Sequence, residues 1–120
     1  MWLALDDVDE RNGCVRYVRG SHRRGMREHH GSGVLGFSQS LVDYGRPEDV
    51  ANEISMPARP GDLLVHHALT IHLAGGNLSA TRQRRSLGLV YYAASCREDS
   101  VAKRAYVEKL RRELLEAGKI

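Results

Sequence analysis

Short apolar runs separated by turn-forming residues fill most of this 120-residue chain and limit what it can fold into. Residues 14–18 and 85–93 alternate between apolar and polar side chains, as half-buried β-strands do. Residues 2–6 form a similar run, and the Asn-Gly turn before Cys14 predicts a hairpin that pairs residues 2–6 with residues 14–18. The alternation over residues 85–93 is strong enough to predict a central strand. The pattern therefore favours a mainly β fold.

Further strands are predicted on both sides of residues 57–62, where two prolines and a glycine interrupt any regular element. Residues 53–56 precede this turn. Residues 63–65 follow it and are expected to form a buried strand. Residues 69–73 form another short apolar run before a Gly-Gly turn.

Two segments carry no pattern of a strand or a helix. Residues 20–36 are rich in Gly, His and Arg without periodicity, which predicts a long loop, and residues 37–52 are interpreted as irregular. Long loops often carry function. We therefore expect His22, His29 and His30 to border a substrate entrance rather than to bind a metal.

The period changes near the C-terminus. Apolar residues recur there at spacings of three and four, behind Asp99 or Ser100 as an N-cap and before Gly118 as a stop: Val107, Leu110, Leu114 and Ala117. This pattern predicts an amphipathic helix over residues 99–117. We expect it to pack on the same domain as residues 1–98.

Charge alone does not indicate a nucleic-acid-binding protein. The net charge is +3, and arginines cluster at residues 82–85 and 111–112, but acidic residues are interspersed along the chain. No aromatic-basic stacking surface and no helix-turn-helix pattern accompany the charge. We therefore expect no nucleic-acid partner.

No apolar run approaches the length that crosses a bilayer, and the first residues do not resemble a secretory leader. Cys14 and Cys96 are isolated in the sequence, which is typical of reduced cysteines rather than of a disulfide scaffold. These features predict a cytoplasmic protein that does not contact a membrane.

Three of the six histidines, His66, His67 and His72, follow the Pro-Gly-Asp turn closely. Imidazole is a ligand of iron, zinc and copper. On extended backbone His66 and His72 face the same way and His67 faces the opposite way, unless a turn at Ala68 resets the phase. Spacing alone leaves open whether these residues bind a metal or form hydrogen bonds at strand ends.

Arg84, Arg85 and Ser86 open the last predicted strand, about a dozen residues beyond His72. A guanidinium group offers a planar fork to a carboxylate, so an arginine near a histidine is a suitable anchor for a dicarboxylic acid held on a metal. Ser86 projects to the same side as Arg84 and can add a hydroxyl donor. The alternative is a solvated basic strand end.

Four motifs follow one another in a fixed order. They are W-L-A-L-D-D at residues 2–7 with N-G-C at 12–14, G-S-H at 20–22, G-D-x-x-x-x-H at 61–67, and L-x-x-H at 69–72 followed by Gly75, Asn77, Ser79 and the Arg84-Arg85 pair. Together they resemble the phytanoyl-CoA dioxygenase family of Fe(II)- and 2-oxoglutarate-dependent oxygenases. The resemblance covers residue 2 to about residue 92.

This resemblance implies a partial double-stranded β-helix, a jelly-roll or cupin-like barrel, over residues 1–98. It also implies one ferrous ion in a two-histidine, one-carboxylate site. His72 matches an iron-binding histidine of the family, and Arg84 matches the arginine that binds the far carboxylate of 2-oxoglutarate. Trp2 matches a tryptophan that lines this cofactor, and Ser86 supports it. The activity implied is hydroxylation of a small organic substrate.

The chain departs from the family pattern in two ways that matter. The other two iron ligands of the family form an H-x-D pair, and no histidine of this chain is followed two residues later by Asp or Glu. We therefore expect the pair upstream of this chain, which would be a C-terminal part that is inactive alone. The spacing from His72 to Arg84 is one residue longer than in the family, which keeps Arg85 as an alternative anchor.

Two other interpretations stay open. One is a non-enzymatic jelly-roll that binds a small ligand or a protein, and the other is a zinc site formed by His66, His67 and His72. A barrel cut through its sheets exposes strand edges, which favours self-association, for example as a homodimer.

Overall fold

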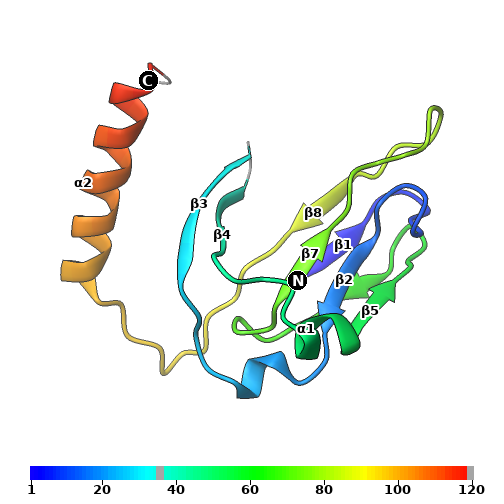
Figure 1. The fold of residues 1–120 in the computed structure, drawn as a ribbon, viewed down its shortest axis with the longest axis horizontal. Helices are drawn as coiled ribbons and strands as arrows, with labels where there is room; N and C mark the ends of the chain where they lie inside the picture. Colours follow the sequence, from blue (N-terminus) through cyan, green and yellow to red (C-terminus); the bar gives the residue numbers. More distant parts are fainter. Residues whose placement is uncertain (35–36, 119–120) are drawn as a thin grey trace. The chain divides into compact units, whose positions relative to one another are not determined.

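The computed structural model describes residues 1–34 and 37–118 and consists mostly of strands (Figure 1). The strands are β1 (Trp2–Ala4), β2 (Val15–Val18), β3 (His29–Val34), β4 (Phe37–Leu41), β5 (Glu53–Met56), β6 (Leu63–Leu64), β7 (His72–Ala74) and β8 (Ser86–Gly88). The helices are a 3-10 turn at Ser21–Arg23, α1 (Pro47–Ala51) and α2 (Ser100–Glu116). The prediction of a mainly β chain with a C-terminal helix is confirmed.

Contacts divide the chain into two compact units, one from Met1 to Val90 and a second that begins at Tyr91. All strands belong to the first unit, and α2 belongs to the second. The division predicted at residue 98, with the helix packed on the same domain, stays a prediction.

The first unit contains two three-stranded antiparallel sheets, ordered β6-β1-β8 and β5-β2-β7, and the separate hairpin β3-β4. The predicted hairpin of residues 2–6 with residues 14–18 is therefore wrong, because β1 and β2 lie in different sheets. Asn12 explains the separation, since its buried side chain donates to the carbonyl oxygens of Asp7 (2.9 Å) and Gln83 (3.0 Å). The connection is thereby tied to a distant segment instead of closing a tight turn.

Residues 20–41 contain more regular structure than predicted. In the loop expected at residues 20–36, β3 begins at His29 and pairs with β4, with His29 opposite Leu41 and His30 opposite Ser40. Residues 35–36 lie outside the described residues. Glycine and serine obscured these strands because neither residue type favours β structure on its own.

The segment expected to be irregular, residues 37–52, also contains α1 after β4. Pro47 begins this helix and Glu48 and Asp49 follow in its first turn, which is a favourable arrangement at a helix N-terminus. The signal was present in the sequence, but a five-residue helix is too short for periodicity to reveal it.

Two strands are less buried than expected. Residues 63–65 were predicted to be buried, but Leu63 is 48% exposed and Val65 is 63% exposed. The central strand predicted over residues 85–93 is limited to β8 at residues 86–88, and β8 lies at the edge of its sheet. Alternation reports which face of a strand is apolar, and it cannot report how many neighbours the strand has.

The predicted start of the C-terminal helix α2 is confirmed. The carboxylate of Asp99 accepts hydrogen bonds from the backbone N–H groups of Val101 (3.2 Å) and Ala102 (2.9 Å), as an N-cap does. In the part of the chain that the structure describes, no helix has the length and apolar character needed to cross a membrane. Cys14 and Cys96 are both free, as predicted.

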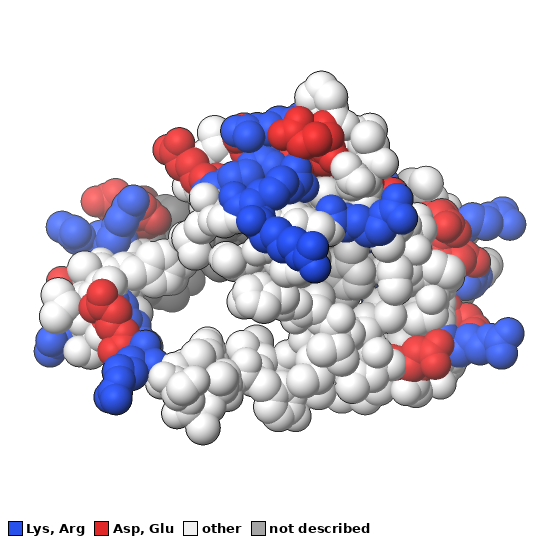
Figure 2. Space-filling model, turned by 90° about the horizontal axis from the view of Figure 1, so that it is seen from below, with Lys and Arg blue, Asp and Glu red and all other residues white. Residues whose placement is uncertain are grey.

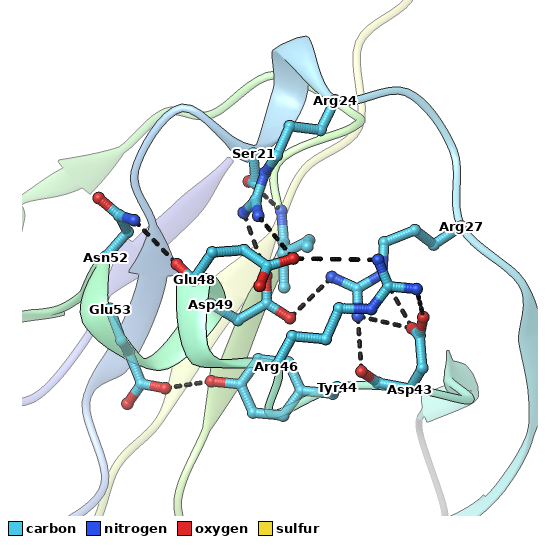
Figure 3. Close-up of polar contacts among 11 residues, drawn as sticks. Ser21, Arg24, Arg27, Asp43, Tyr44, Arg46, Glu48, Asp49, Asn52 and Glu53 are labelled. Atoms are coloured by element: carbon cyan, nitrogen blue, oxygen red, sulfur yellow. Dashed lines mark hydrogen bonds and ion pairs between the residues drawn. The ribbon is translucent and has the colours of Figure 1, made fainter.

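A network of ion pairs joins the segment after the 3-10 turn to α1 (Figure 3). Asp49 is fully buried, and its carboxylate accepts from Arg27 at 2.7 Å and lies 3.1 Å from Arg24. Arg27 also donates to Asp43 at 2.8 Å. Burial by itself raises the pKa of Asp49, but the guanidinium groups of Arg27 and Arg24 outweigh it and hold that pKa below its usual value.

Candidate functional site

A cavity of about 670 Å³ lies in the first unit, lined by residues of both three-stranded sheets. Trp2 and Ala4 of β1 line it together with Ser86 of β8, as do Val15 of β2 and His72 of β7. Opposite residues in an antiparallel pair share a face, and the register pairs Ala4 with Ser86 and Val15 with Ala74, all four of which line the cavity. One face of each sheet therefore borders the cavity.

The residues predicted as a site all line this one cavity: Trp2, His72, Arg84 and Ser86. They come from both ends of the sequence of the first unit, and the strands among them belong to both sheets. The rings of Trp2 and His72 approach edge to face, with centroids 6.4 Å apart and an interplanar angle of 62°. Trp2 lies opposite Gly88, and a Cβ at Gly88 would be in ordinary van der Waals contact with the indole, at 4.0 Å.

The orientation of His72 is fixed by its own backbone segment. Nδ1 of His72 lies 2.9 Å from the carbonyl oxygen of Thr70, so Nδ1 is the donor and Nε2 is the nitrogen that can bind a metal. Ile71 holds this segment in place, because its N–H donates to Oγ of Ser21 at 2.8 Å and its carbonyl accepts from Val18 at 3.0 Å. The buried serine of the G-S-H motif therefore positions His72.

A second histidine lies beside His72. The ring centroids of His66 and His72 are 4.7 Å apart, and the hydroxyl of Tyr17 lies 2.9 Å from Nδ1 of His66. Burial, aided by His72 and the terminal amino group of Met1, lowers the pKa of His66 to about 4. His66 is therefore a neutral imidazole at neutral pH. Sequence reasoning placed His66 and His72 on one side but gave no signal for Tyr17.

His67 does not join this pair. Its ring lies near His22, with centroids 5.8 Å apart, and its Nδ1 accepts a hydrogen bond from the N–H of Leu69 at 3.1 Å. Of the three histidines in the alternative zinc site, only His66 and His72 lie together.

The two candidate arginines have different surroundings. Arg85 donates to the carboxylate of Asp6 through its backbone N–H (2.6 Å), Nε (3.1 Å) and Nη2 (2.8 Å). The guanidinium group holds the pKa of Asp6 at about 2. Arg85 is therefore already occupied by an acidic partner within the chain.

Arg84 is half-buried, and its Nη1 donates to the carbonyl oxygen of Gly13 at 2.6 Å. Among the side chains that the structure describes, no carboxylate forms an ion pair with Arg84. A guanidinium group has five N–H donors, so one bond to Gly13 orients it and leaves donors for a ligand. Both arginines line the cavity, and Arg84 has donors left for a ligand whereas Arg85 is paired with Asp6.

A dicarboxylic acid fits these residues better than an iron ion does. The cavity has a half-buried arginine, a serine hydroxyl and an imidazole on its wall. Within residues 1–34 and 37–118, however, no group of three His, Cys, Asp or Glu side chains is arranged to hold a metal. A facial iron site with three protein ligands is thus not formed by the described residues.

Several of the positive charges in the first unit are paired with nearby acidic groups. On the face that Figure 2 presents, Asp and Glu side chains lie close to several of the Lys and Arg side chains. Arginines across the first unit form ion pairs with carboxylates: Arg16, Arg24, Arg27, Arg46, Arg82 and Arg85. The expected lack of a nucleic-acid partner stays a prediction.

The fold and the cavity define a class of mainly β protein in which two antiparallel sheets border a cavity lined by Trp2, His72 and Arg84. The model of the phytanoyl-CoA dioxygenase (PhyH) family matches residues 1–86. The chain belongs to the phytanoyl-CoA dioxygenase family.

Relatives in plants and animals agree with this assignment. The chain is 31% identical over 90 residues to "Phytanoyl-CoA dioxygenase 1" of Oryza sativa subsp. japonica, covering 74% of the chain and 31% of that protein. It is 26% identical over 119 residues to "Phytanoyl-CoA dioxygenase, peroxisomal" of Rattus norvegicus, covering 96% of the chain and 34% of that protein. The chain thus spans about a third of the length of these relatives. No solved structure matches it significantly.

Proposed function

We propose that this chain forms the 2-oxoglutarate pocket of an Fe(II)-dependent dioxygenase that hydroxylates a small organic substrate. Members of the family generally depend on Fe(II) and 2-oxoglutarate. The observation that carries the proposal is that Trp2, His72 and Arg84, matched to family positions by sequence, line one cavity together with Ser86.

Each residue has a separate task in the proposed site. Arg84, oriented by its bond to Gly13, binds the far carboxylate of 2-oxoglutarate, and Ser86 donates a hydroxyl hydrogen bond on the same side. His72 presents Nε2 to the metal because Thr70 occupies Nδ1. Trp2 covers the cofactor and excludes water. When bound, iron and 2-oxoglutarate would supply the chemistry by which O2 oxidises the oxoacid to succinate and CO2 and hydroxylates the substrate, one oxygen atom entering succinate and the other the product.

The proposal is tested by 2-oxoglutarate binding, measured by calorimetry on the wild-type chain and three variants. Arg84→Met is expected to weaken binding by about tenfold or more, since a charge-assisted hydrogen bond pair is lost. Arg84→Lys keeps the charge but not the fork, so we expect a smaller loss. Arg85→Met is the matched control and should bind like the wild type, because Asp6 already occupies Arg85. Equal binding by Arg84→Met and the wild type would overturn the proposal.

We also propose that this chain is inactive alone, as a C-terminal part of a longer oxygenase. The donors found among the described residues do not complete a three-ligand site, and the sequence has no H-x-D pair. With Fe(II), ascorbate and 2-oxoglutarate, no succinate above background is expected. The coding sequence upstream of Met1 should contain an in-frame H-x-D segment, and adding the encoded segment should restore turnover. Turnover by the chain alone contradicts this part of the proposal.

The proposed architecture is part of a double-stranded β-helix. The two antiparallel sheets whose faces line a common cavity support it. The sheets also end in strands with one partner each among the described residues, including β6 and β8, which carry the exposed Leu63 and Leu87. We expect these edges to pair in a homodimer, measured by light scattering after gel filtration. A monodisperse monomer contradicts this expectation.

A non-enzymatic binding module is the second candidate, favoured by the incomplete metal donor set. It predicts ligand binding without turnover even when the upstream coding sequence is included, and it requires that no H-x-D segment is found there.

The proposed location is the cytoplasm, although the rat relative is named as peroxisomal. Imaging a tagged full-length protein distinguishes the two compartments.

A further inference from the structure

His66 lies in a position that the oxygenase proposal does not use. It comes directly before the histidine of the G-D-x-x-x-x-H motif in the sequence. Its ring lies beside that of His72, with the two ring centroids 4.7 Å apart. Both rings lie in the first unit. His66 is half-buried and His72 is more exposed, at the cavity wall.

The hydrogen bonds of the two rings leave the same nitrogen for a ligand. Nδ1 of His72 is taken by the carbonyl oxygen of Thr70, and Nδ1 of His66 is taken by the hydroxyl of Tyr17, each at 2.9 Å. Within the described part of the chain, Nε2 of neither ring forms a hydrogen bond. Histidines that bind metals commonly use one ring nitrogen for the metal and hold the other in such a bond.

The ring separation suits two ligands of one ion. With a metal–nitrogen bond of about 2.1 Å, two imidazoles bound about 90° apart, as in a square-planar Cu²⁺ or Ni²⁺ site, have ring centroids about 4.6 Å from each other. The observed separation of 4.7 Å matches this arrangement. His22 and His67, at 5.8 Å, lack the paired Nδ1 contacts, because only His67 has a bond at Nδ1, from the N–H of Leu69.

We propose that His66 and His72 form a two-imidazole site for a divalent transition-metal cation, with Tyr17 as the residue that positions His66. Imidazole pairs select late first-row metals such as Cu²⁺, Ni²⁺ and Zn²⁺ over Mg²⁺ or Ca²⁺. Tyr17 is buried to 8% exposure between β5 and β7, so its hydroxyl holds the ring of His66 from a rigid position. The site needs no residue beyond the described ones and does not depend on 2-oxoglutarate. It uses the same Nε2 of His72 that is proposed above to bind iron, so the two cations compete for this histidine.

The test is Cu²⁺ binding to the untagged 120-residue chain, by calorimetry and electron paramagnetic resonance. One Cu²⁺ per chain is expected, with hyperfine splitting from two nitrogens. His66→Phe and His72→Phe should each weaken binding by about tenfold or more, and Tyr17→Phe should weaken it about tenfold through loss of the positioning bond. His22→Phe and His67→Phe are matched controls and should bind like the wild type.

The proposal is overturned if His66→Phe binds Cu²⁺ as tightly as the wild type, or if His67→Phe loses as much Cu²⁺ affinity as His66→Phe. Because a variant can fail to fold, the wild-type chain gives an independent measurement: Zn²⁺ should shift the ¹⁵N resonances of Nε2 in His66 and His72 but not in His22 or His67. Shifts confined to His72 also overturn it. Arg84→Met separates this site from the oxygenase proposal, since it should weaken 2-oxoglutarate binding and leave Cu²⁺ affinity unchanged.

Discussion

The side-chain amide of Asn12 donates a 3.0 Å hydrogen bond to the carbonyl oxygen of Gln83, 71 residues further along the chain. The same amide nitrogen donates to Asp7, and the amide oxygen accepts from the N–H of Asp9 at 2.8 Å. Asn12 is fully buried and lies next to Gly13, whose carbonyl orients Arg84. One side chain thus joins the turn after β1 to the segment that carries the candidate cofactor-binding arginine.

Asn12→Ala is expected to destabilise the chain by about 1–3 kcal/mol, because the fully buried amide of Asn12 and its hydrogen bonds to the carbonyl oxygens of Asp7 and Gln83 are lost. Urea denaturation measures the change. Asn77→Ala is the matched control: Asn77 is exposed and its amide donates to Arg82, so its loss should cost less than about 1 kcal/mol. Similar losses in the two variants contradict the role given to Asn12.

Gly13 and Gly20 both have positive φ angles, of 83° and 71°, but only Gly13 is crowded. A Cβ at Gly13 would lie 2.5 Å from the carbonyl oxygen of Gly75, whereas nothing lies within 4 Å of one at Gly20. Gly20→Ala should therefore cost about 1–2 kcal/mol for its backbone conformation alone. Gly13→Ala should cost clearly more, because the turn at Gly75 has to move. Equal urea midpoints for the two variants contradict the close approach.

The ion pair between Asp6 and Arg85 predicts that the stability of the fold depends on pH in the acid range. Arg85 lowers the pKa of Asp6 from 3.8 to about 2 in the folded chain. A lowered folded-state pKa stabilises the fold above the unfolded-state pKa, and this contribution is lost as the pH falls from about 4 to about 2. Asp6→Asn should thus differ most from the wild type near pH 6 and least near pH 2, as measured by urea midpoints.

Arg85→Met removes the same pair from the other side and should reduce the acid dependence in the same way. If Asp6→Asn keeps the full pH dependence of the wild type between about pH 4 and pH 2, the pair does not shift this carboxyl group.

Because the carboxylate of Asp49 is buried, removing its ion-pair partner Arg27 is expected to lower the stability of the chain strongly. Arg27→Met leaves Asp49 with only the more distant Arg24 as a cation and should destabilise the chain by about 3 kcal/mol. Arg16→Met is the control, because the Arg16–Glu53 pair is more exposed and should contribute less than about 1 kcal/mol. Chemical denaturation followed by circular dichroism measures both. A loss from Arg27→Met no greater than that from Arg16→Met contradicts the network.

Local patterns in the sequence predicted the features that depend on near neighbours. Asp99 caps α2 because an N-cap contacts only the next three residues, and residues 53–56 form β5, as predicted from their place before the turn at residues 57–62. The order of motifs also indicated the family, and the residues it selected line one cavity.

Only the tertiary structure decided which strands pair and which arginine is available. β1 pairs with β6 and β8, and β2 pairs with β5 and β7, so β1 and β2 do not pair with each other. Asp6 accepts hydrogen bonds from Arg85, which lies 79 residues further along the chain. Ser21 bonds to Ile71 and Tyr17 to His66, each about 50 residues away, and the local sequence does not indicate these partners. Short strands have many partners of similar local quality, so long-range packing, rather than propensity, selects among them.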